Sequence, residues 1–140
     1  MITRATWLAA FVTVTACSSG AKREAASLVS AVERYRRVEN IQKPAEANTI
    51  AAVACTDREV CEVKAACIAV SEPTSKGLAL KAEVERGMAD IEAKRIPVDS
   101  DEARALAPKL ETASNLLEKG RAALAACDEK VLALRLKYSL

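Results

Sequence analysis

Residues 110–134 read LETASNLLEKGRAALAACDEKVLAL. Apolar or small side chains recur in this stretch at alternating spacings of three and four residues, which is the period of a helix that packs along one seam. The seam positions are Leu110, Ala113, Leu117, Gly120, Leu124, Cys127, Val131 and Leu134. No segment shows the period-two alternation of a β-strand. The pattern predicts an all-α fold whose last helix packs lengthwise against a partner.

Helical periodicity also extends through the residues before this seam. It predicts four further helices, over residues 22–39, 45–54, 57–70 and 76–94. The stretch SEPTS at residues 71–75 predicts a turn, and Pro97 ends the fourth of these helices. Residues 99–102 open the last helix, in which Pro108 either kinks or restarts the chain. Short connections of this kind predict an up-and-down bundle of four or five antiparallel helices.

Particular residues are expected to cap or face the core of this bundle. Thr56 with Glu59 forms the Thr-x-x-Glu pattern of a capping box, and Asp99 with Glu102 forms a second capping pair. Gly87 and Gly120 mark places where two helices approach closely. Inward-facing stripes are expected at Leu28, Val32, Tyr35 and Val38 in the first helix, and at Leu80, Val84, Met88 and Ile91 in the fourth.

The composition disfavours several kinds of function. The chain holds 21 basic and 19 acidic residues and no histidine. After residue 16, Tyr35 and Tyr138 are the only aromatic residues, so the stacking surfaces that single-stranded nucleic acids require are missing. Histidine is the commonest general base, and no nucleophile–base motif or phosphate-binding loop is present. We therefore expect a protein that is not an enzyme, needs no cofactor or metal, and binds no nucleic acid.

Two groups of charged residues allow alternative functions. Paired acids, Asp99 with Asp101 and Glu83 with Glu85, would suit a carboxylate-based hydrolase if a cleft brought them together. They fall on predicted polar faces or caps, and the solvated-surface interpretation is preferred. The first helix is locally basic, which would allow contact with anionic headgroups or a simple solvated face, the interpretation we favour. Its basic residues are Lys22, Arg23, Arg34, Arg36 and Arg37.

The first sixteen residues differ from the rest of the chain. One basic residue, Arg4, precedes an apolar run of about ten residues, which is too short to span a bilayer and is typical of a secretory signal. The sequence Val14-Thr15-Ala16-Cys17 that follows resembles the lipobox of bacterial lipoproteins. This resemblance implies cleavage before Cys17 and lipidation of its thiol and new amino group. Ser18 is the kind of residue that accompanies transport to the outer membrane. The alternative is an ordinary signal peptide.

The predicted organisation is a cleaved signal at residues 1–16, a short lipidated tether at 17–21 and one helical domain at 22–140. We expect a lipid-anchored protein of the bacterial cell envelope, at the outer membrane, that acts as a non-catalytic protein-interaction or assembly factor. Its partners would be the membrane, through Cys17, and an envelope protein. A carrier that holds an apolar ligand between helices is the alternative.

The four cysteines after Cys17 are expected to form two disulfides, because exported domains with an even cysteine count usually do. Spacings of five intervening residues and the absence of histidine disfavour a zinc site. If residues 57–70 are helical, Cys61 and Cys67 are separated by about 9 Å of rise, beyond the roughly 7 Å that a disulfide allows between Cα atoms. Cys55 and Cys67 lie at opposite ends of the same segment.

Only Cys55–Cys61 together with Cys67–Cys127 survives this elimination. The turn predicted at residues 71–75 is difficult to reconcile with a Cys67–Cys127 bond. A full reversal at Pro73 would leave Cys67 nearly two turns from the level of Cys127, whereas a helix that continues through Pro73 would bring the two level.

Overall fold

The computed structural model describes the backbone of residues 16–140 and the side chains of residues 19–140. The lipobox prediction, including the side chain of Cys17, lies outside the described residues. Within residues 16–140 the chain is helical apart from short connections, and no strand is present. The predicted all-α fold is therefore confirmed.

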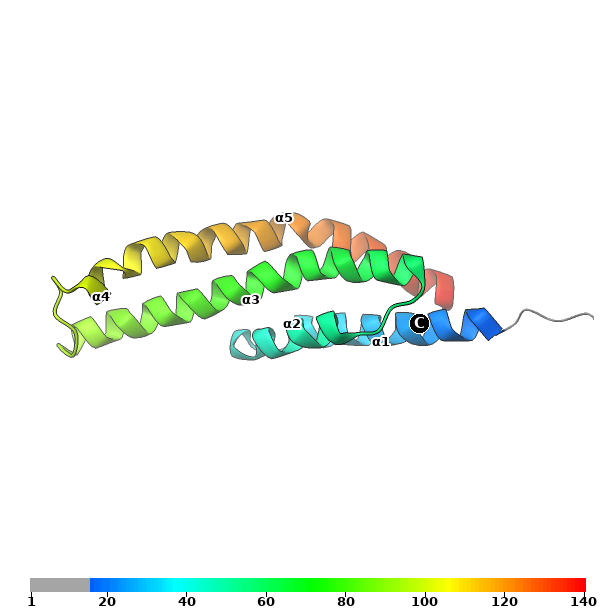
Figure 1. Cartoon of the computed structure of the whole chain (residues 1–140), viewed down its shortest axis with the longest axis horizontal. Helices are drawn as coiled ribbons and strands as arrows, with labels where there is room; N and C mark the ends of the chain where they lie inside the picture. Colours follow the sequence, from blue (N-terminus) through cyan, green and yellow to red (C-terminus); the bar gives the residue numbers. More distant parts are fainter. Residues whose placement is uncertain (1–15) are drawn as a thin grey trace, which may run out of the picture.

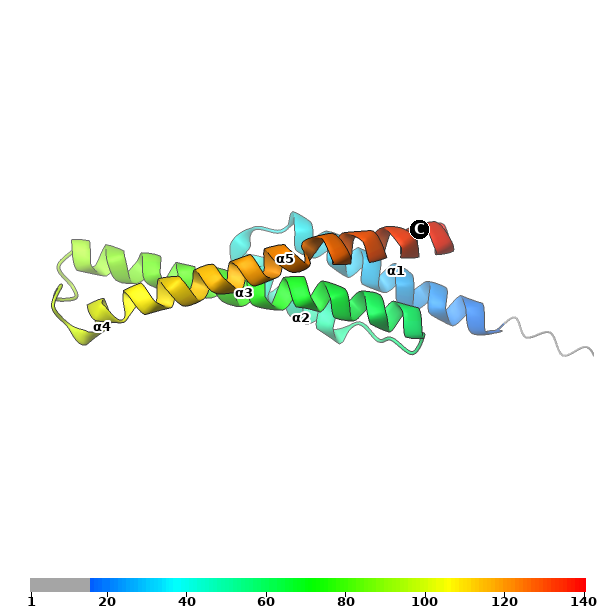
Figure 2. The ribbon, with the colours of Figure 1, turned by 90° about the horizontal axis from the view of Figure 1, so that it is seen from above.

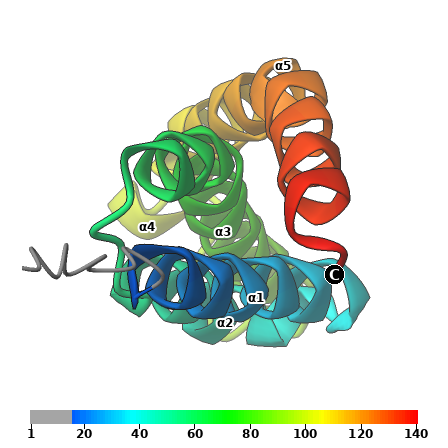
Figure 3. The ribbon, with the colours of Figure 1, turned by 90° about the vertical axis from the view of Figure 1, so that its right-hand side faces the viewer.

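The helices form two layers that run up and down the molecule. Their bounds are α1 Ala16–Arg37, the 3-10 turn η1 Asn40–Gln42, α2 Lys43–Ala52, α3 Arg58–Glu92, α4 Asp101–Arg104 and α5 Leu106–Tyr138. Figures 1 and 3 show α1 and α2 in one layer and α3 and α5 in the other. In the part of the chain that the structure describes, no helix combines the length and apolarity needed to cross a bilayer.

The hydrophobic core lies at one end of the bundle, where α1, α2, α3 and α5 meet. Leu28 of α1, Ile50 of α2 and Leu134 of α5 are fully buried there, and each contributes about 1.5–3 kcal/mol by leaving water. Three residues of the predicted stripe, Leu28, Val32 and Tyr35, are buried in this core, whereas Val38 lies just after the end of α1 and is only partly buried. The disulfide between Cys67 and Cys127 belongs to the same cluster.

The turn predicted at residues 71–75 is wrong, because α3 continues through Pro73 as one helix of 35 residues. Proline inside a helix costs about 3 kcal/mol through a lost hydrogen bond and a clash. Packing on both sides outweighs this cost. Cys67 is bonded to α5 before Pro73, and Gly77 lies against α5 after it. The two helices predicted over residues 57–70 and 76–94 are therefore one.

Three helix starts also differ from the predictions. α1 begins at Ala16, so residues 17–21, predicted as a tether, form its first turns. The N-cap of α3 is Asp57, whose carboxylate accepts from the Val60 N–H at 3.1 Å, and not Thr56. Ser100, rather than Asp99, caps α4 by accepting from the Ala103 N–H. In both helices the cap is one residue later than the capping pattern predicts.

The most extensive interface between two helices is the antiparallel pairing of α3 with α5. Glycines on these helices allow a short distance between their axes. A Cβ placed on Gly120 would lie 2.1 Å from Thr74 Oγ1 and 3.0 Å from the carbonyl oxygen of Val70, so the helices touch there. The predicted close approach is confirmed at Gly120, and Gly77, 3.0 Å from the carbonyl oxygen of Ala113 at its Cβ position, adds one that periodicity did not indicate. At Gly87 the same position would meet only the side chain of Leu106.

Candidate functional site

The half of the α3–α5 pair farthest from the core forms a distal arm, defined here as residues 77–120. Figures 1 and 2 show it extending beyond the ends of α1 and α2 with no helix laid over it. Between residues 78 and 119 only Val84 and Ala113 are buried. The arm is therefore a two-helix structure whose apolar residues are covered by one neighbour instead of three.

Two large apolar side chains in the middle of the arm are exposed. Met88 is 53% exposed and Leu110 is 44% exposed, although the periodicity placed both on inward stripes. Gly77 faces Leu117 and Gly87 faces Leu106, so Leu110 lies at the level of Val84. Met88 lies about one turn nearer the tip. The two exposed side chains therefore occupy adjacent levels of the arm.

The arm keeps its shape through its seam and its ion pairs. Lys109 bridges α5 to Glu83 of α3 at 3.2 Å, and Lys81 pairs with Glu85 along α3 at 3.7 Å. Exposed pairs of this kind contribute little each, up to about 1 kcal/mol. They also account for Glu83 and Glu85, one of the acid pairs considered for catalysis. Each of these two carboxylates faces a lysine across the arm surface, and they do not converge on a cleft.

The remaining acid pair sits at the tip of the arm. Asp99 is exposed, and Asp101 is exposed and paired with Arg104 at 3.0 Å. Among residues 19–140, no group of three or more cysteine or carboxylate side chains is arranged to hold a metal ion. Asp99 and Asp101 are therefore solvated surface carboxylates.

The basic residues of α1 are largely committed to contacts within the bundle. Arg34 pairs with Glu46 of α2 at 3.1 Å, Arg36 pairs with Asp128 of α5, and Arg37 pairs with Glu33 of its own helix at 3.0 Å. The contacts of Arg34 and Arg36 join α1 to its neighbours. The arrangement favours the solvated-face interpretation over a headgroup-binding face.

Both predicted disulfides are present. Cys55 and Cys61 have Cα atoms 5.3 Å apart, and those of Cys67 and Cys127 are 4.8 Å apart. Cys67 and Cys127 are 1% and 3% exposed, whereas Cys55 and Cys61 are both partly exposed. The first bond therefore closes a surface corner between α2 and α3, and the second lies inside the core.

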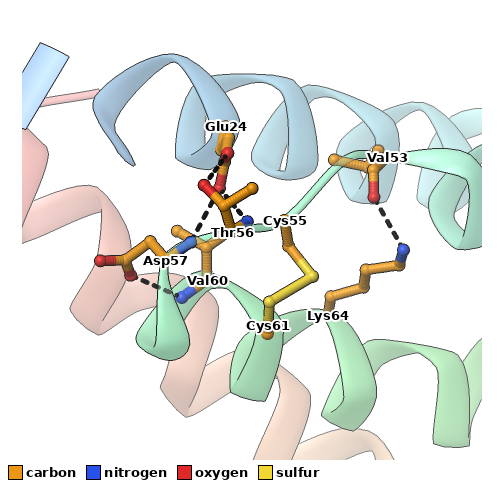
Figure 4. The surroundings of a disulfide bond; sticks show 8 residues. All are labelled: Glu24, Val53, Cys55, Thr56, Asp57, Val60, Cys61 and Lys64. Atoms are coloured by element: carbon orange, nitrogen blue, oxygen red, sulfur yellow. Dashed lines mark hydrogen bonds between the residues drawn. A yellow bond between two sulfur atoms is a disulfide. The ribbon is translucent and has the colours of Figure 1, made fainter. Parts of the chain in front are cut away.

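A carboxylate from α1 closes the same corner (Figure 4). Glu24 accepts from the Thr56 hydroxyl at 2.7 Å, from the Thr56 N–H at 2.8 Å and from the Asp57 N–H at 3.2 Å. Lys64 donates to the carbonyl oxygen of Val53 at 2.7 Å on the other side of the disulfide. The Thr56 hydroxyl, which the sequence pattern assigned to helix capping, therefore donates to Glu24 instead.

Glu24 is expected to make the stability of the protein pH-dependent. Its hydrogen bonds from the Thr56 side chain, and then from the Thr56 and Asp57 amides, lower the pKa of the Glu24 carboxyl below its ordinary value of 4.5. A carboxyl whose pKa is lower in the folded state stabilises the fold above its unfolded pKa, and this stabilisation is lost as pH falls through the folded pKa. Glu24→Gln should therefore unfold at a lower temperature than the wild type at pH 7, with the difference shrinking towards pH 3.

Thermal unfolding of both proteins across pH 3–7 measures this effect. Glu62→Gln is the matched control, because Glu62 forms only an exposed pair with Arg58. A Glu24→Gln deficit that is the same at pH 3 as at pH 7 would contradict the assignment of the three hydrogen bonds to an ionised carboxylate.

No protein-family model, no curated protein and no solved structure matches this chain.

The exposed arm is the feature that periodicity missed. Helix length is the signal that indicates it. A helix of ten residues such as α2 covers about 15 Å, whereas α3 with 35 residues is about 52 Å long. Short helices cannot cover both halves of a long hairpin. Because α3 continues through Pro73, α1 and α2 are too short to pack over the residues near Met88 and Leu110.

Proposed function

We propose that this chain is a non-catalytic lipoprotein of the bacterial cell envelope, anchored through Cys17, that acts as a protein-interaction or assembly factor through its distal arm. The observation that carries the proposal is the pair of exposed apolar side chains, Met88 and Leu110, on an arm that no other helix covers. Contiguous exposed apolar surface is typical of protein-binding sites, and Met88 and Leu110 occupy adjacent levels of the arm.

The placement of the two ends supports the anchored form of this proposal. α1 starts at one end of the molecule and the tip of the arm, residues 93–100, lies at the other (Figure 1). A lipid on Cys17 would hold the core end at the membrane and direct the arm away from it. The outer membrane is the proposed location, on the basis of Ser18.

The arm also suits a helical or extended partner better than a small substrate. Its side chains form a long, shallow surface whose ionisable groups are nine acidic and seven basic residues, a nearly balanced set. Partners that lay an apolar stripe along a helix pair are held by a few anchor residues spaced by whole turns. Met88 and Leu110 would be such anchors.

Affinity capture of the intact lipoprotein from solubilised envelopes tests this proposal. We expect a protein partner to co-purify with the wild type. The double variant Met88→Gln with Leu110→Gln should recover at least about tenfold less of it, because each lost anchor weakens binding by about 1–2 kcal/mol. Both side chains are exposed, so the variant should unfold at nearly the wild-type temperature.

Leu132→Gln is the matched control, since Leu132 is 58% exposed on α5 outside the arm. The control should recover the partner fully. Equal recovery by the arm variant and the control, or the absence of any co-purifying protein, would show that the arm is not a binding surface.

A further inference from the structure

The exposed side of the distal arm continues a side of α5 that is covered in the core. Apolar residues of α5 recur every seven residues, at Leu110, Leu117, Leu124 and Val131. Seven residues are nearly two turns, so these side chains lie in line on one side of the helix. Val131 is 2% exposed, whereas Leu124 and Leu110 are 43% and 44% exposed. One line of side chains is therefore buried in the core and uncovered beyond it.

Helix α1 covers this line of side chains in the core. Val131 is buried in the same cluster as Leu28 and Val32 of α1. α1 ends at Arg37, and Figures 1 and 2 show it stopping where the arm begins. The chain then turns through η1 into α2, which makes no contact with α5. The fold itself thus shows which kind of element fits this side of α5, namely a helix with an apolar stripe laid along it.

The charges beside this line follow the same repeat. Arg135, Asp128 and Arg121 are spaced by seven residues along α5. Arg135 pairs with Glu33 of α1 at 2.7 Å. Asp128 pairs with Arg36 of the same helix. Arg121 is exposed and forms no ion pair with any residue in the range 19–140, so it is free to receive a carboxylate from a helix that continues in line with α1.

Helix α3 supplies the other half of the uncovered surface. Met88 is 53% exposed and lies 18 residues, or about five turns, after Val70, on the same side of α3. Val70 packs against the core cluster. α3 therefore repeats what α5 shows, with one side packed in the core and uncovered in the arm. The uncovered residues of the two helices, called the arm face, are Met88, Leu110, Leu117 and Leu124.

We propose that the arm face binds an amphipathic helix of the partner protein, which lies end to end with α1 and completes a three-helix bundle with α3 and α5. From Leu110 to Leu124 the face is about 21 Å long, the length of a helix of about 15 residues. Such a helix presents apolar side chains every three or four residues to the arm face, and a carboxylate to Arg121. This inference rests on the proposed function and identifies the kind of partner that the arm takes.

Site-specific photo-crosslinking of the intact lipoprotein in bacterial cells tests the position of the partner. The probe is p-benzoylphenylalanine, introduced at one position at a time. Met88 and Leu110 should crosslink to the partner. Arg86 and Thr112 are the matched controls, because each is exposed and lies two residues away, on the opposite side of its helix. Crosslinking should be lost at these control positions.

Mass-spectrometric mapping of the crosslinked peptides then determines the conformation of the partner segment. Leu110 and Leu124 are both exposed and lie 14 residues apart on α5. Probes at these two positions should attach to partner residues that are also about 14 apart, because two helices have the same rise per residue. An extended strand rises more than twice as far per residue, and its attachment points would be only about six residues apart.

The charge of Arg121 gives a second measurement. Arg121→Glu should lower the recovery of the partner in affinity capture roughly fivefold, the value of about one exposed ion pair. Lys130→Glu is the matched control, because it makes the same change of charge at an exposed position nine residues further along α5, on the opposite side of the helix. This control should recover the partner fully.

The outcomes separate this inference from the proposed function. Attachment points about six residues apart, equal crosslinking at the control positions, or crosslinks between two copies of this chain would overturn the partner helix and still leave the arm a binding surface. Equal recovery by Arg121→Glu and Lys130→Glu would overturn the carboxylate opposite Arg121. The absence of crosslinks from every position on the arm would overturn the proposed function as well.

Discussion

Replacing Cys67 and Cys127 together with alanine is expected to lower the free energy of unfolding by about 4 kcal/mol. The bond joins residues 60 positions apart, and the chain-entropy model gives roughly 4 kcal/mol for a loop of that length. Cys55–Cys61 joins residues only six positions apart, for which the same model gives about 2 kcal/mol. The two disulfides should therefore differ about twofold in their effect.

The position of the Cys67–Cys127 bond increases its effect. It lies in the core, on the two helices that continue into the distal arm, and its loop contains the whole arm. Without it, only the seam and a few exposed ion pairs would hold α3 to α5 beyond the core. Loss of this bond should consequently loosen the arm as well as lower global stability.

Urea unfolding of the oxidised protein and of the two double-cysteine variants measures this difference. Mild thiol reductant provides a second measurement, since the partly exposed Cys55–Cys61 bond should open before the buried Cys67–Cys127 bond. Equal losses of stability in the two variants, or earlier reduction of Cys67–Cys127, would contradict the assigned roles.

The disulfide pairing was predictable because helix geometry fixes which Cα atoms can meet. A rise of about 1.5 Å per residue excluded Cys61–Cys67 without any knowledge of the tertiary fold. The same reasoning required Cys67 and Cys127 to lie level, which a reversal at Pro73 would not allow. The cysteine pairing therefore predicted correctly that α3 continues through Pro73, whereas the proline itself predicted a turn.

The errors share one cause, which is that local patterns do not report contacts between distant residues. Thr56 matches a capping box, but Glu24 lies 32 residues earlier and takes its hydroxyl. Met88 and Leu110 match inward stripes, but a stripe is buried only where a neighbouring helix reaches it. The candidate site was missed for this reason, since it consists of residues that the fold leaves uncovered.

The tether at residues 17–21 illustrates the same limit with a functional consequence. The sequence predicts only a short tether before the first helix, yet the backbone there is helical and continuous with α1. A lipid on Cys17 would then be joined directly to a helix that packs in the core. The orientation of the arm relative to the membrane would follow from the orientation of α1.

Changing Cys17 to alanine is expected to remove the protein from the membrane fraction or to leave its signal peptide uncleaved. Lipoprotein processing requires the cysteine thiol for attachment of the diacylglycerol, and cleavage follows that attachment. Two or more acyl chains anchor a protein stably, whereas one chain does so marginally.

Fractionation of cells and the intact mass of the purified protein measure this outcome. The wild type should pellet with membranes and carry the mass of its acyl groups on residue 17. The double variant Cys55→Ala with Cys61→Ala is the matched control, because it also removes cysteines but leaves the anchor, and it should pellet like the wild type. A Cys17→Ala protein that is processed normally and still pellets would show that residues 14–17 are not a lipobox.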